Sequence, residues 1–157
     1  EGIAAGGRYW VLFGIGAIGG PVILGRIADR IGFTAAVRAA VVIEAVLVGA
    51  LALTADRWVL ALSSLVIGAF VPGITTLVLG RVREAVGSDV ASGQAAWSIA
   101  TAAFALGQPA AAYGYSYLFA KSGLYTPLFA LGEVALVLAF ALDVGFIPPP
   151  SSPPRRQ

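Results

Sequence analysis

Five stretches of the chain are long, apolar and nearly free of charge, and this feature restricts the possible folds more than any other. A helix rises 1.5 Å per residue, so about 20 apolar residues span the hydrocarbon core of a bilayer. The stretches run over residues 9–24, 35–54, 58–80, 92–119 and 124–146. Backbone polar groups in lipid must be satisfied within the segment, and these stretches lack the alternation of barrel strands. They predict an all-α membrane protein with five transmembrane helices in one bundle, over residues 1–147.

The composition agrees with a lipid environment. Hydrophobic residues make up 59% of the chain and charged residues 11%, against about 25% charged in ordinary soluble domains. Cysteine and histidine are absent, which excludes disulfides and the usual zinc ligands. The basic residues form no continuous stripe, so we expect the lipid bilayer as a partner and no nucleic acid, cofactor or metal. The chain begins with Glu1 and contains no methionine, so we expect it to be part of a longer protein.

Basic residues predict how the bundle is oriented. The connections over 54–57, 81–91 and 121–123 are short, which makes neighbouring helices antiparallel. Seven of the ten basic residues then fall on one side of the membrane, and the positive-inside rule assigns that side to the cytoplasm. The seven are Arg26, Arg30, Arg38, Arg81, Arg83, Arg155 and Arg156. We therefore expect a multi-pass protein of the plasma (inner) membrane, with a disordered, proline-rich cytoplasmic tail over 148–157.

The segment 25–40 carries charges between two apolar stretches and contains the pattern Gly25-x-x-x-Asp29-Arg30-x-Gly32. The glycines permit a tight turn and close helix approach. A carboxylate at a helix entrance can meet a helix dipole or an arginine, which contributes about 0.3–1 kcal/mol when exposed. One interpretation is a latch that holds one state of a two-state transporter. The alternative is that these charges only determine topology.

This pattern resembles the cytoplasmic loop signature of the major facilitator superfamily, although Phe33 and Thr34 stand where two basic residues are usual. The stretches "LVIGAFVPGITTLVLGRVREAVG" and "QAAWSIATAAFALGQPAAAYGYSYLFAKSGLYTPLFALG" are similar to the last helices of its YbfB/YjiJ-type branch. The resemblance implies that the five helices are the eighth to twelfth of a twelve-helix transporter, in its C-terminal half. It also implies a gating role for the loop, with the missing N-terminal half as a partner.

Two acidic residues, Glu44 and Glu133, lie near the middle of their predicted helices. An ionised acid is costly at that depth. One interpretation is a proton carrier, because burial can bring a carboxyl pKa into a working range. The alternative, which we favour, is a protonated or hydrogen-bonded packing group. The resemblance agrees with packing. It implies that the helices carrying Glu44 and Glu133 are the ninth and twelfth of the transporter, which support the core from outside.

A stripe of polar and aromatic side chains follows the fourth predicted helix at intervals of three and four residues, which places them on one face. The stripe comprises Gln94, Trp97, Thr101, Phe104 and Gln108. Such groups require protein or a wet cavity, because their amides lack partners in hydrocarbon. The resemblance implies that this fourth predicted helix is the eleventh of the transporter, which flanks a central substrate cavity. A hydrogen-bonded seam between helices is the alternative.

Small residues and prolines add two further expectations. Gly14, Gly16, Gly19 and Gly20 give the first helix a small-residue face, which favours close helix packing over a substrate passage. Pro72 and Pro109 each remove a backbone hydrogen bond, and a plain kink is a simpler interpretation than a broken helix at a binding site.

The resulting hypothesis is secondary active transport of a small solute by alternating access. No nucleotide-binding motif is present in the sequence, and no cluster of catalytic groups favours an enzyme. The alternative is a non-transporting five-helix membrane protein that acts as an assembly or interaction partner.

Overall fold

A computed structural model describes residues 3–87 and 89–146, and within them the chain is helical and has no strand. The five helices are α1 (Ile3–Ile31), α2 (Phe33–Leu53), α3 (Arg57–Val86), α4 (Val90–Ser122) and α5 (Thr126–Phe146). The predicted all-α fold with five helices is confirmed. The predicted tail over 148–157 lies outside the described residues.

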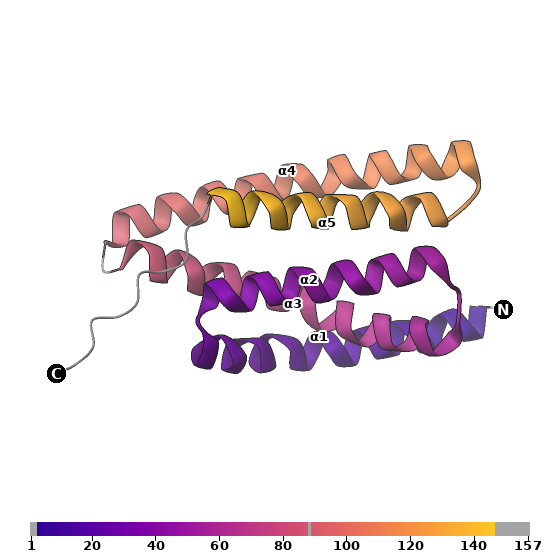
Figure 1. Ribbon diagram of the computed structural model, residues 1–157, viewed down its shortest axis with the longest axis horizontal. Coiled ribbons are helices and arrows are strands. Elements are labelled where there is room, and N and C mark those ends of the chain that lie inside the picture. The colour runs from indigo at the N-terminus through magenta and orange to yellow at the C-terminus, as the bar shows by residue number, and fades with distance from the viewer. Residues whose placement is uncertain (1–2, 88, 147–157) are drawn as a thin grey trace.

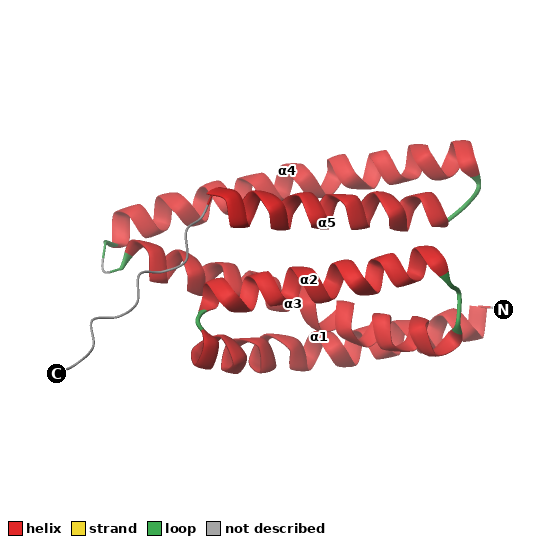
Figure 2. Ribbon diagram, viewed as in Figure 1, coloured by secondary structure: helices red, strands yellow, loops and turns green. Residues whose placement is uncertain are grey.

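Consecutive helices are antiparallel and joined by short turns (Figures 1 and 2). The α1/α2 turn, the α3/α4 turn and the end of α5 lie at one end of the bundle, called here the Gly32 end. The start of α1, the α2/α3 turn and the α4/α5 turn lie at the other, called the Asp56 end. Helix α1 packs most extensively on α3, and α2 packs on α3 and α5. Helix α4 makes fewer contacts, with α3 and α5.

The helices extend beyond the apolar stretches, which corrects two predicted loops. Helix α1 continues through Asp29 and Arg30, and the α1/α2 connection is reduced to Gly32. Its φ of +86° lies in a region that favours glycine. Helix α3 likewise continues through Arg81 and Arg83. Charges end an apolar stretch, but they leave the backbone hydrogen bonds of a helix intact.

The contact between α1 and α3 is a seam of glycines. A Cβ atom at Gly16 would overlap the Leu65 carbonyl, and one at Gly20 would overlap the Ala69 backbone. Gly14, in contrast, faces open space. Small residues allow membrane helices to approach closely enough for backbones to touch. For Gly16 and Gly20 the expected packing role is therefore confirmed. For Gly14 and Gly19 it is not observed, because Gly19 meets a side chain of its own helix, that of Ile23.

Two aspartates cap helices at the turns. Asp56 accepts hydrogen bonds from the amides of Trp58 (2.8 Å) and Val59 (3.3 Å). Asp89 accepts from the Ser92 hydroxyl (2.6 Å) and from the amides of Ala91 (3.1 Å) and Ser92 (3.3 Å). The Ser92 hydroxyl and these amides hold the pKa of Asp89 below its ordinary value. Both carboxylates satisfy amides that the first turn of a helix leaves without partners.

Four of the five helices have the length and apolarity of a membrane span, namely Gly6–Ile31, Phe33–Leu53, Arg57–Val86 and Thr126–Phe146. Helix α4 is outside this group because glutamines, serines, tyrosines and glycines dilute its apolar residues. It nevertheless joins the Gly32 end of α3 to the Asp56 end of α5, so it runs the full length of the bundle (Figure 1). Only a helix that also crosses the membrane can connect two spans in this way.

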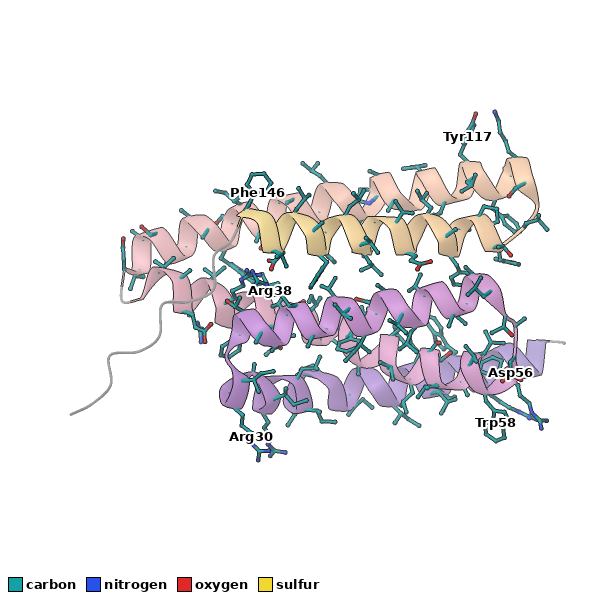
Figure 3. All side chains as sticks on the ribbon, in the orientation of Figure 1. Arg30, Arg38, Asp56, Trp58, Tyr117 and Phe146 are labelled. Carbon is teal, nitrogen blue, oxygen red and sulfur yellow. The ribbon has the colours of Figure 1, made fainter. Side chains whose placement is uncertain are left out.

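The exterior of the bundle is apolar, and its small buried core lies among the first three helices. The core consists of Ala28, Ala36, Val37, Ala40, Phe70 and Leu77. Trp58 and Tyr117 project outward near the Asp56 end (Figure 3). Arg57 lies 5.4 Å from the Trp58 ring and Lys121 4.8 Å from the Tyr117 ring. Aromatic and basic side chains in this arrangement are typical of a membrane–water interface.

Candidate functional site

A hollow of about 270 Å³ lies between α3 and α4. Its lining comes from Ile74, Thr75 and Val78 of α3 and from Trp97, Ala100, Thr101 and Phe104 of α4. Three residues of the predicted stripe therefore border one hollow, and none of the lining residues is charged. We call this hollow the chamber.

A second hollow, of about 520 Å³, lies toward the Gly32 end and shares Trp97 with the chamber. We call it the mouth. It is lined by Leu79, Val82, Arg83, Val86, Gly87, Asp89, Val90, Gly93, Gln94 and Trp97. Gln94 thus joins the stripe residues that border a hollow, whereas Gln108 is exposed and borders neither.

The polar groups of these hollows differ in availability. The Thr101 hydroxyl donates to the Trp97 carbonyl of its own helix at 2.9 Å, a local bond that occupies its hydrogen. The Asp89 carboxylate is engaged in capping α4. The side chains of Arg83 and Gln94 make no hydrogen bond or ion pair with any described residue. The mouth therefore contains a guanidinium and an amide that are free to meet a solute.

Neither proline breaks its helix. Helix α3 continues through Pro72, and α4 continues through Pro109. The hollows are consequently bordered by intact helices.

The Gly25–Gly32 segment is exposed at its charged positions. Arg30 points away from the bundle at the end of α1 (Figure 3). Within the described part of the chain, the side chains of Asp29 and Arg30 make no hydrogen bond or ion pair. A Cβ atom at Gly25 would lie 3.8 Å from Thr76, an ordinary contact, so only Gly32 is required by its conformation.

Phe33 has a structural role at the position where the family signature usually has a basic residue. Its ring occupies a notch on α3 that a side chain at Gly80 would fill. Its amide donates to the Glu84 carboxylate at 3.3 Å. The turn between α1 and α2 is thereby attached to the end of α3.

The two intramembrane acids lie on different helices and are both partly buried. The Glu133 carboxylate of α5 packs against Gly49 of α2, where an added Cβ would lie 2.7 Å from Oε1. Neither the Glu44 nor the Glu133 carboxylate makes a hydrogen bond or ion pair with a described residue. The structure places Glu133 in the interface between α2 and α5, and it shows no hydrogen bond between Glu44 and Glu133.

An ionic cluster at the Gly32 end was not predicted. Arg38 Nε of α2 donates to Asp143 Oδ2 of α5 at 2.8 Å, and Arg81 of α3 pairs with the other carboxylate oxygen. Arg38 lies between α2 and α5 (Figure 3). The three side chains are only 15–22% exposed. One signal was available in the sequence, because all three residues lie near helix ends on the same side.

No group of three or more metal-ligating side chains occurs among the described residues. In comparisons with known proteins, a family model described as "Uncharacterised MFS-type transporter YbfB" matches residues 1–144. No curated protein matches the chain, and no solved structure does.

Proposed function

The chain belongs to the YbfB-type family of major facilitator transporters, and from this premise we propose that it is the C-terminal part of a twelve-helix secondary transporter that moves a small solute by alternating access. Its family is one of transporters and not of enzymes. Membership also favours transport over a non-transporting assembly role. The remaining partner of the bundle is, in this proposal, the N-terminal half of the same transporter.

The observation that carries the proposal is the groove formed by the chamber and the mouth, called here the α3–α4 groove. Four stripe residues line it: Gln94, Trp97, Thr101 and Phe104. Helix α4 is less apolar than its neighbours and has no buried residue among those described. A helix of this kind suits a water-filled cavity shared with another half better than it suits lipid. Gln108 extends the same face beyond the chamber.

The other candidate residues receive supporting roles. Asp29 and Arg30 are exposed and available for contact with the N-terminal half, while Gly25 and Gly32 belong to the turn that presents them. Glu44 and Glu133 act as packing groups. The basic residues at the Gly32 end support a cytoplasmic location for this end and for the C-terminus, in the plasma membrane.

The test is thiol accessibility in the complete transporter. This chain contains no cysteine, so Phe104→Cys adds a single thiol to it, and any cysteines elsewhere are first replaced. In alternating access, a membrane-impermeant reagent labels Phe104→Cys both in right-side-out and in inverted vesicles. Leu138→Cys on α5, exposed and apolar, serves as the lipid-facing control and stays unlabelled. If Phe104→Cys, like Leu138→Cys, stays unlabelled in both kinds of vesicle, the proposal is contradicted.

A further inference from the structure

The α3–α4 groove changes chemical character along its length. Its chamber is apolar and aromatic, and its mouth contains the polar groups, with Trp97 bordering both. A groove graded in this way suits a solute with one apolar end and one polar end.

The chamber itself offers almost no polar contact. Trp97 and Phe104 supply aromatic surface, and Ile74 and Val78 supply aliphatic surface. Thr75 and Thr101 are the hydroxyl-bearing residues of the lining, and the Thr101 hydroxyl already donates to its own backbone. A charged group would lose its hydration here without compensation. The chamber therefore suits an uncharged, apolar or aromatic body of a size that fits about 270 Å³.

The mouth is lined by one guanidinium, that of Arg83, and one carboxylate, that of Asp89, and the two side chains form no ion pair. The Arg83 side chain has no hydrogen-bond or ion-pair partner among the described residues. The carboxylate of Asp89 accepts from the Ser92 hydroxyl and from two amides at the start of α4, where the positive end of the helix dipole also offsets its charge. The Gln94 amide can donate a further hydrogen bond beside it. The charged group left for a ligand is thus the Arg83 guanidinium, and the Gln94 amide beside it can donate or accept.

We propose that the α3–α4 groove binds an amphipathic organic carboxylate. Its carboxylate pairs with Arg83, whose planar guanidinium matches two carboxylate oxygens, and receives a hydrogen bond from Gln94. Its apolar or aromatic body lies against Trp97 and Phe104. This inference names the substrate class of the proposed transport site and rests on that function.

The test uses three probes with the same aromatic body and different polar ends: phenylacetate, 2-phenylethanol and 2-phenylethylammonium. Their affinities for the purified complete transporter are measured by isothermal titration calorimetry at neutral pH. We expect phenylacetate to bind tightest. Because hydrogen bonds to charged groups are strong, Arg83→Gln weakens phenylacetate binding about tenfold or more, while Arg83→Lys weakens it less. Arg26→Gln, an exposed arginine on α1, is the matched control and leaves the affinity unchanged.

Three results would overturn the inference: equal or tighter binding of the alcohol or the amine, an unchanged phenylacetate affinity in Arg83→Gln, or no binding of any probe. Thiol labelling of Phe104→Cys separates these from a failure of the transport proposal, because it requires no knowledge of the substrate. If labelling occurs from both sides while phenylacetate does not bind, the substrate class is wrong and alternating access stands. If labelling also fails, the groove is not the passage.

Discussion

Replacing Asp143 with asparagine tests how the last helix is held against the rest of the bundle. Asp143 of α5 pairs with Arg38 of α2 and Arg81 of α3. The Asp143→Asn change keeps the shape of the side chain and removes its charge. Two arginines would then face each other without their shared counter-ion.

The expected cost lies between two limits. Removing one partner of a fully buried ion pair costs about 3–5 kcal/mol, whereas an exposed pair contributes about 0.2–1 kcal/mol. The cluster is 15–22% exposed, and polar contacts between membrane helices are weakened by alternative partners in the unfolded state. We expect a loss of about 2 kcal/mol, which corresponds to about a thirtyfold change in the unfolding equilibrium constant.

The assay is equilibrium unfolding of the purified complete transporter in mixed micelles of increasing denaturing detergent. Arg8→Gln is the control for the loss of one exposed charge, because Arg8 of α1 is exposed and its side chain has no partner among the described residues, and it should cost less than about 0.5 kcal/mol. Adding Arg81→Met to Asp143→Asn should restore part of the lost unfolding free energy, since it removes one of the two arginine charges that paired with Asp143. If Asp143→Asn costs no more than Arg8→Gln, the cluster does not hold α5 in place.

Three further predictions concern packing, pH and orientation. Gly20→Val should destabilise the bundle by about 1–3 kcal/mol through overlap with α3, while Gly14→Val, which faces open space, should leave the thermal midpoint nearly unchanged. Hydrogen bonds lower the pKa of Asp89, so its stabilisation of the first turn of α4 is full above the ordinary aspartate pKa and is lost as pH falls through the lowered value. The hydrogen-exchange protection factors of the Ala91 and Ser92 amides, corrected for the intrinsic pH dependence of exchange, should therefore fall at acid pH, and Asp89→Ala should abolish this dependence. With the Gly32 end in the cytoplasm, an impermeant reagent added to intact cells should label Arg57→Cys and spare Arg83→Cys, and the reverse result would invert the topology.

Much of the fold follows from the sequence because the membrane leaves few alternatives. Apolar stretches of bilayer length predict helices, and short connections predict antiparallel neighbours, as observed. The helix ends were less predictable, since hydropathy changes where lipid ends and not where the backbone turns. At Gly32 the turn depends on a positive φ, and at Arg81 the helix continues into the charged zone.

The candidate site was predictable only where its residues share one helix. Helical spacing alone places Trp97, Thr101 and Phe104 on one face, and all three border the chamber. The contribution of α3 required knowledge of which helix packs beside α4. The same limit applies to the cluster of Arg38, Arg81 and Asp143, which depends on the relative depth of three helices far apart in the sequence.

The glycine seam between α1 and α3 has a consequence for biosynthesis. About fifty residues separate Gly16 of α1 from Leu65 of α3, whose carbonyl it faces in this seam, and α2 is made between them. At about 5–20 residues per second, α1 waits roughly 3–10 s after synthesis before its main neighbour emerges. During that interval its glycine face is open to lipid or to any helper protein that shields nascent helices. The bundle therefore assembles around a contact that skips one helix, and a ribosome that stalls before α3 leaves α1 without its partner.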